Sequence, residues 1–271
     1  MKCTLSLMLF IVLLGTTALA ADSIPYETGF EASEGFTAGQ SIDGQNGWQV
    51  LSTGADATVI DDAAAQEGGQ SVSLEANSQI DKPLTAGAED SIIWMEGYFK
   101  GSGTSAEPDF PDTPAASAIV FFGSDGIKCY NGDQPAETAW EEAGVSPQSD
   151  SWIKISIRQN YTTKKWRCYI DESPAPDKDL GFRDDVASLN GFRNFADTAS
   201  FLDAFRVIPA KKGDANADGK VDAADIVTLI NDPSGSAMGL IEKDNADVDD
   251  DGGIDADDLD SLISQMILNV S

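Results

Sequence analysis

The sequence predicts a mainly β protein, in which a two-sheet antiparallel β-sandwich precedes a small α-helical module. The first observation is that short runs of alternating apolar and polar residues fill the middle of the chain, separated by Gly, Pro, Ser and Asp. The second is that no convincing long helical pattern occurs before residue 222, whereas apolar residues recur at helical spacing after it. Many short strands with long irregular connections favour Greek-key or jelly-roll wiring.

Residues 1–20 have the features of a secretory signal peptide. Lys2 supplies a charged start, residues 5–14 an apolar core, and Ala18-Leu19-Ala20 a small-residue cleavage site. The apolar run is shorter than the roughly 20 residues that a membrane-spanning helix needs. We therefore expect cleavage near Ala20, a secreted protein and no membrane insertion.

Residues 21–209 are expected to form the sandwich. The clearest part is a hairpin over residues 151–172, in which two alternating runs flank a polar turn at residues 160–165. The residues expected on its core face are Ile153, Ile155, Ile157, Trp166, Cys168 and Ile170. The other strand candidates are Ala57–Asp61, Gln70–Glu75, Ile92–Lys100, Ala116–Phe122 and Phe201–Ile208. Residues 135–143 are compatible with a short helix.

Three parts of this domain share a pattern with one family. They are Tyr26–Phe36 with Gly44–Trp48, the pair Trp152–Ile157 and Lys165–Asp171, and the closing segment Phe201–Val207. Together they resemble the concanavalin A-like (laminin-G-like) lectin sandwiches over about 180 residues. The resemblance implies a jelly-roll sandwich. Members of that family bind glycans or proteins, cleave polysaccharides or accompany a catalytic domain, so the fold leaves the function open.

Catalysis is not favoured by the residues present. The chain contains no His, which excludes Ser-His-Asp and Cys-His catalysis. Laminarinase-like hydrolases on the same sandwich place three acids on one strand as Glu-x-Asp-x-x-Glu, and this triplet is absent from the sequence. A carboxylate pair assembled from separate strands keeps a polysaccharide-degrading hydrolase or lyase as the alternative.

Aromatic side chains are the candidate glycan contacts, because their flat apolar faces stack on pyranose rings. Trp152 and Trp166 belong to the apolar phase of the hairpin or flank it, so we expect both to pack in the core. Trp140 lies among Glu and Ala in a polar segment, which makes it the best candidate for an exposed glycan contact.

A cation site within the sandwich is a further expectation. In several carbohydrate-binding sandwiches a Glu near the first strand and an Asp on the last strand share a structural cation, and Glu31 and Asp203 occupy comparable places. This would be a third calcium ion in the protein. The alternative is that both are surface acids of a very acidic chain.

Two cysteines remain after the signal peptide is removed with Cys3. Cys129 and Cys168 each lie on the apolar phase of an alternating segment. An exported protein permits a disulfide between them, and two separate buried thiols are equally compatible with the sequence.

The charge balance excludes two classes of partner. Acidic residues outnumber basic residues 46 to 17, which gives a net charge of −29. Nucleic acids and anionic membranes repel such a chain, so neither is expected as a partner.

The tail, residues 210–271, contains the same acidic pattern twice. The copies start at Asp214 and Asp247, and each has oxygen-bearing side chains at positions 1, 3, 5, 9 and 12 and a glycine at position 6. This is the spacing of an EF-hand calcium loop, with Asp in place of Glu at position 12. Two copies in one register predict two calcium ions. Neither loop is preceded by an amphipathic helix, so each unit is a loop followed by its exiting helix.

This tandem of loop–helix units resembles the type I dockerin module, which folds on binding calcium and docks onto a cohesin domain. The resemblance implies side-chain ligands Asp214, Asn216, Asp218, Asp222 and Asp225, and Asp247, Asp249, Asp251, Asp255 and Asp258, with backbone carbonyls from Lys220 and Gly253. Positions 10 and 11, often Ser-Thr in cellulosomal dockerins, are Ala223-Ala224 and Ala256-Asp257. Calcium binding therefore carries over from the resemblance, and cohesin binding does not.

The sequence as a whole predicts a secreted, non-catalytic protein. Its sandwich is expected to recognise a polysaccharide or surface glycan, and its tail to bind calcium and dock onto a cohesin-like protein. Two alternatives stay open. One is the polysaccharide-degrading enzyme, and the other is a structural protein whose tail packs on its own sandwich.

Overall fold

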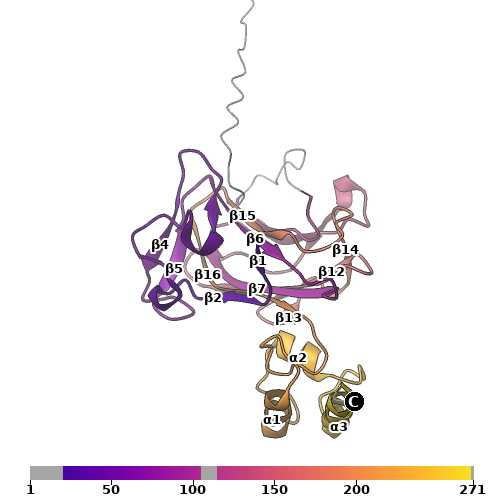
Figure 1. The fold of residues 1–271 in the computed structure, drawn as a ribbon. Helices are drawn as coiled ribbons and strands as arrows, with labels where there is room; N and C mark the ends of the chain where they lie inside the picture. Colours follow the sequence, from indigo (N-terminus) through magenta and orange to yellow (C-terminus); the bar gives the residue numbers. More distant parts are fainter. Residues whose placement is uncertain (1–20, 105–114, 270–271) are drawn as a thin grey trace, which may run out of the picture.

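A computed structural model describes residues 21–104 and 115–269. These residues form a β-sandwich of two layers with a helical module beneath one of them (Figure 1). The expected mainly β fold with a small helical C-terminal module is confirmed. The expected signal peptide, residues 1–20, lies outside the described residues and stays a prediction.

The layer next to the module is one nine-stranded sheet, with strand order β13-β12-β11-β7-β16-β5-β4. β14 pairs with β12, and β2 pairs with β16. All of these pairs are antiparallel. The strands are β2 (Tyr26–Thr28), β4 (Ala57–Asp61), β5 (Gln70–Leu74), β7 (Ile92–Gly101), β11 (Ile153–Asn160), β12 (Lys165–Ile170), β13 (Ser173–Pro174), β14 (Leu180–Gly181) and β16 (Ser200–Pro209).

The opposite layer consists of two smaller sheets. One is ordered β1-β6-β15 with β3 beside β6, and the other is ordered β10-β9-β8. The strands are β1 (Asp22–Ser23), β3 (Gln49–Val50), β6 (Ser78–Thr85), β8 (Val120–Gly123), β9 (Gly126–Tyr130), β10 (Trp140–Glu142) and β15 (Gly191–Ala196). β1 and β6 are parallel, and the other pairs of this layer are antiparallel.

The predicted hairpin forms as β11 and β12, with Ile157 opposite Cys168. β6 and β15 were not among the predicted strands, because their apolar residues alternate with charged ones only weakly. The short helix expected over residues 135–143 is a 3-10 turn at Ala136–Thr138 followed by strand β10.

Large aromatic residues fill the space between the layers. Phe30, Trp48, Phe205 and Trp166 are all almost completely buried, so Trp166 packs in the core as predicted. The same prediction was wrong for Trp152. This side chain is half-buried outside the main core. Its Nε1 donates to the Ala64 carbonyl at 2.7 Å, and the Lys100 ammonium lies 4.4 Å from the centre of its ring.

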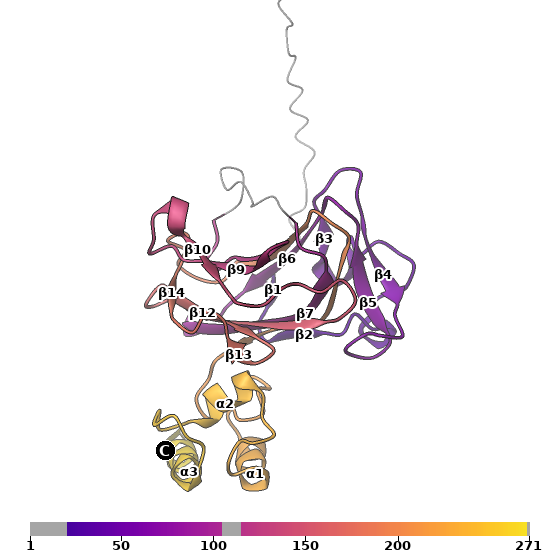
Figure 2. The same ribbon diagram turned by 180° about the vertical axis from the view of Figure 1, so that it is seen from behind.

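The module contains three helices in the described residues: α1 (Ala223–Asn231), α2 (Leu240–Ala246) and α3 (Ala256–Asn269). Leu229 and Leu262 pack together at its centre with Ala215 and Ala246. α2 was not predicted, and it is the helix nearest the sandwich, whereas α1 and α3 lie at the far end of the molecule (Figures 1 and 2). Among the described residues, no helix has the length and apolar character needed to cross a membrane.

Candidate metal centres and neighbouring sites

The first acidic loop, residues 214–225, is organised by backbone N–H groups that point at carboxylates. Asp214 is fully buried and accepts from the N–H groups of Asp218 at 3.0 Å and Gly219 at 2.9 Å. The side-chain oxygen of Asn216 accepts from the same Asp218 N–H at 3.0 Å. Gly219 has φ +87°, a left-handed conformation that glycine adopts without a steric penalty. Burial raises the pKa of Asp214 to about 6, and the negative charges of Asp225 and Asp218 add to this increase.

The carboxylate at position 12 closes the loop and starts α1. Asp225 is buried, and its two oxygens accept from the N–H groups of Asn216 at 3.2 Å and Asp222 at 2.8 Å. Asp222 accepts in return from the N–H of Ala224 at 2.8 Å, which completes a capping box. The same two aspartates therefore shape the loop and cap the helix.

The second loop, residues 247–258, repeats this arrangement. Asp258 is buried and accepts from the N–H groups of Val248 at 2.6 Å and Asp255 at 2.8 Å. Asp247 accepts from the N–H of Gly252 at 3.2 Å, and Gly252 has φ +88°. The carboxylates of Asp247, Asp249 and Asp258 each place an oxygen within 4.8 Å of the others. The two loops thus share a buried carboxylate at position 12 and a left-handed glycine at position 6, whereas the carboxylate at position 1 is buried more deeply in the first loop.

Both loops offer the all-oxygen donors that calcium requires. The clearest sign is the Oδ1 atom of Asp247, which is buried and has no hydrogen-bond donor among the described residues. Such an orphaned carboxylate oxygen is costly to bury unless a cation or another donor satisfies it. Asp218 and Asp251, at position 5, fix the backbone at position 7. Their side-chain oxygens accept from the N–H groups of Lys220 at 2.9 Å and Gly253 at 2.8 Å.

Residues 212–267 match the family model of the dockerin type I domain. The resemblance predicted for the tail is confirmed, and domains of this type bind calcium and dock onto cohesins. We call this segment the dockerin module. Each predicted ligand lies in one of its two loops, and the assignment of individual ligands stays a prediction.

Several solved structures are similar to the chain at low identity. A sialidase has a TM-score of 0.47 at 11% identity over 73% of this chain and 19% of its own. A Trypanosoma rangeli sialidase in complex with 2,3-difluorosialic acid has a TM-score of 0.38 at 11% identity, over 72% and 33%. A Bacillus subtilis protein of unknown function with a galectin-like fold has a TM-score of 0.29 at 14% identity, over 60% and 89%.

The chain covers 19% and 33% of the lengths of these two sialidases. The similarities are too low to carry an argument about function. No curated protein matches the sequence.

Glu31 and Asp203, the candidates for a further cation, both bind the backbone of one loop. Glu31 accepts from the N–H groups of Gly69 and Gln70, each at 2.8 Å. Asp203 accepts from the N–H of Gln66 at 2.6 Å, and burial raises its pKa. The fold thus brings the two acids to neighbouring parts of the same loop, and a cation between them stays a prediction.

The structure places Trp140, the candidate for an exposed glycan contact, in a strand. It is the first residue of β10 and is half-buried. Its ring packs edge-on against Tyr130, with centroids 5.3 Å apart, and against Phe121 at 5.6 Å. This packing reduces the face that Trp140 can offer to a sugar.

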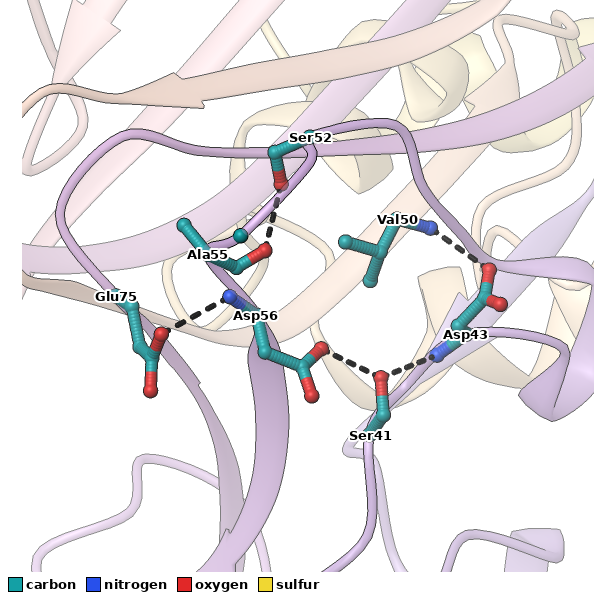
Figure 3. Close-up of a pocket in the computed structure, with 8 residues that line it drawn as sticks. Ser41, Asp43, Val50, Ser52, Ala55, Asp56 and Glu75 are labelled. Carbon is teal, nitrogen blue, oxygen red and sulfur yellow. Dashed lines mark hydrogen bonds between the residues drawn. The ribbon is translucent and has the colours of Figure 1, made fainter.

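A shallow polar pocket of about 360 Å³ lies beside β3 and β4 (Figure 3). Its carboxylates are engaged within the protein. Asp43 accepts from the Val50 N–H at 2.9 Å, and Asp56 accepts from the Ser41 hydroxyl at 2.6 Å. Since the lining contains no aromatic side chain, the pocket lacks a stacking platform for a sugar.

A larger groove of about 790 Å³ lies between the layers, beside β15 and β8. Aromatic side chains make up much of its lining: Phe99, Phe121, Phe122, Phe192, Phe201 and Phe205. Phe195 also lines it and is 53% exposed. An ion pair of Arg193 and Asp81, 2.8 Å apart, completes this part of the lining. This groove was not predicted, because the alternation along β15 is too weak to mark it as a strand.

Cys129 and Cys168 are both buried and are free thiols. They belong to the same core, on β9 of one layer and β12 of the other. The neighbouring Cys168 thiol and burial raise the pKa of Cys129. The structure therefore places close together two residues whose distance the sequence left open.

Proposed function

We propose that this is a secreted, non-catalytic protein whose dockerin module binds two calcium ions and docks onto a cohesin-like partner, while its sandwich recognises a polysaccharide or surface glycan. The observation that carries the proposal is that the segment matching the dockerin type I model contains two acidic loops of the same spacing, the second of which brings three carboxylates within 4.8 Å of one another. A bound calcium ion would supply the positive charge and the coordination that hold each loop closed.

The residues of the loops have separate roles in this proposal. Asp214, Asp225 and Asp258 are buried and Asp247 is half-buried, and these residues at positions 1 and 12 hold the ends of each loop together through backbone N–H groups. Positions 3 and 5 are more exposed and complete the oxygen shell. Because like-charged carboxylates repel one another in the absence of a cation, binding and folding of the module are coupled.

Calorimetric titration tests the calcium part of the proposal. The full chain is expected to bind two ions, and Asp251→Ala is expected to remove one of them, because the second loop loses a ligand. Asp257→Ala is the matched control, since this exposed acid in the first turn of α3 lies at position 11 and is no predicted ligand. Equal stoichiometry in all three proteins would refute the ligand assignment.

The groove supports the glycan part of the proposal. It combines aromatic side chains with the Arg193–Asp81 ion pair, and ligand sites for sugars need both apolar faces and a few polar groups. Phe195 is the aromatic side chain of the groove with a substantial exposed surface. It replaces Trp140 as the first choice for a stacking contact.

A polysaccharide-binding screen tests the glycan part of the proposal. Phe195→Ala is expected to weaken binding at least about tenfold, which corresponds to the loss of one stacked aromatic contact. Leu51→Ala is the control, because Leu51 is a similarly exposed apolar residue that does not line the groove. Released reducing ends or unsaturated products would instead favour the polysaccharide-degrading alternative.

A second candidate is a structural protein whose module packs on its own sandwich. One observation favours it: the indole Nε1 of Trp94 in β7 donates to Asp244 in α2 at 2.8 Å. This candidate predicts calcium-dependent stability without a glycan ligand and without a cohesin-like partner. The two candidates share the calcium loops and differ in whether the module also binds another protein.

A further inference from the structure

The outer face of the nine-stranded sheet is buried where the dockerin module covers it. Trp94 and Glu96 lie on β7, two residues apart, so their side chains project from the same face of the sheet. Each is only 2% exposed, although neither is a residue of the core between the layers. The module meets the sheet through α2 (Figure 2). We call this contact the junction.

Asp244 of α2 is held by two residues of the sheet. The guanidinium of Arg158 donates to both of its oxygens, at 2.9 and 3.3 Å, and the indole of Trp94 donates at 2.8 Å. A bidentate Arg–carboxylate pair fixes orientation as well as distance. This contact therefore sets how α2 lies on the sheet.

A second ion pair runs from the sheet to α2 through Arg206. Its Nε donates to Glu96 at 2.8 Å and its Nη1 donates to Glu242 of α2 at 2.9 Å. Glu96 also accepts from the Ser156 hydroxyl at 2.7 Å. In a chain of net charge −29, arginines at this face complement the acidic side of the module.

The first calcium loop is part of the junction. Ala217, at position 4 of that loop, packs in one buried cluster with Trp94, Ile208 and Ile241. Gly219, at position 6, lies so close to the sandwich that an added Cβ would be 2.9 Å from Pro25.

The second loop differs at the equivalent position. An added Cβ on Gly252 would have no atom within 4 Å among the described residues. The two loops share their spacing and the left-handed glycine at position 6, but only the first supplies an apolar residue to the junction cluster.

We propose that a cation in the first loop tightens the junction, and that a cation in the second loop does not, so that calcium at one of two similar sites determines how firmly the sandwich holds the module. This inference rests on the proposed calcium binding. The physical reason is that an ion closing residues 214–225 also fixes Ala217 and Gly219, which touch the sandwich. The second loop follows α2 directly, with Asp247 as the C-cap of that helix, but none of its described residues is in the junction cluster.

The indole N–H of Trp94 reports on the junction directly, because it donates to Asp244 across it. Its hydrogen exchange is measured by NMR on the full chain in calcium, and the signal is assigned by its loss in Trp94→Phe. Asp218→Ala and Asp251→Ala are a matched pair at position 5. We expect the Trp94 indole to exchange at least about tenfold faster in Asp218→Ala than in Asp251→Ala. Equal exchange in the two variants would overturn the proposal.

Gly219→Ala and Gly252→Ala provide a second matched pair. Their φ angles are +87° and +88°, so an alanine is equally strained within either loop. Only Gly219→Ala adds a clash with Pro25. Faster exchange of the Trp94 indole in Gly219→Ala alone supports the proposal, and the same rate in both variants contradicts it.

Calorimetric titration of the same proteins separates the two possible failures. If the wild-type chain binds no calcium, the proposed function fails and the junction proposal fails with it. If each position-5 variant loses one ion but Trp94 responds equally to both, only the junction proposal is refuted.

Discussion

At the scale of single residues, burial and not residue type decides what each acid does. Asp214 and Asp258 are buried and accept several backbone N–H groups, so they organise the loops. Asp43 and Asp56 make comparable bonds at a shallow pocket, where they connect neighbouring segments of the sandwich. The acidic composition therefore cannot be read as one uniform charged surface.

The buried cysteines lead to a prediction at this scale. Buried thiols react slowly because the reagent cannot reach them, so Cys129 and Cys168 should resist iodoacetamide in the folded protein. Unfolding in guanidinium without a reductant should make both fully reactive. Peptide mapping by mass spectrometry measures each site separately and keeps Cys3 out of the comparison. Peptides that stay unlabelled after unfolding would show a disulfide instead.

At the scale of secondary structure, α2 is the element that joins the two parts of the protein. It has seven residues and lies between the calcium loops. Its residues contact both parts of the protein. Glu242 and Asp244 form ion pairs with the sheet, whereas Ala246 packs in the core of the module. A helix this short is unstable alone, so its contacts on both sides hold it in place.

Shortening one side chain of α2 tests this view. Ile241 is fully buried in the junction cluster. Ile241→Ala should lower the free energy of unfolding of the dockerin module by about 2–5 kcal/mol, because apolar burial is lost and a cavity remains. Val227→Ala on α1 is the control, because Val227 is 54% exposed and its loss should change the value by less than about 0.5 kcal/mol. Denaturant unfolding followed by circular dichroism in calcium measures both. Similar losses in the two variants would argue against α2 as the anchor.

At the scale of the whole molecule, the net charge of −29 leads us to expect that cations stabilise the acidic loops of the module. Carboxylates gathered in the two loops repel one another until a cation neutralises them. The sandwich has a large apolar core of its own and does not share this dependence. The two parts should therefore respond differently when calcium is removed.

Scanning calorimetry with and without a chelator measures this difference. Calcium at a hundred times its dissociation constant stabilises a site by about 2.7 kcal/mol, so the module should unfold at a clearly lower temperature after chelation. The sandwich transition should persist, with a smaller shift that reflects the loss of the junction. One unchanged transition would contradict calcium-dependent folding of the module.

The sequence by itself determined the features that depend on local spacing. The calcium loops are such a case, because their oxygens come from one short segment and glycine at position 6 permits the turn. The hairpin of β11 and β12 is another, since alternation and a polar turn specify it locally.

Only the tertiary structure decided the features that join distant segments. Three features belong to this group: the packing of α2 over Trp94, the groove beside β15 and the proximity of Cys129 to Cys168. Each depends on which strands become neighbours and on which face another element covers, and alternation along one strand carries neither piece of information. A loop closes on residues a few positions away, whereas a junction needs the whole sheet to be assembled first.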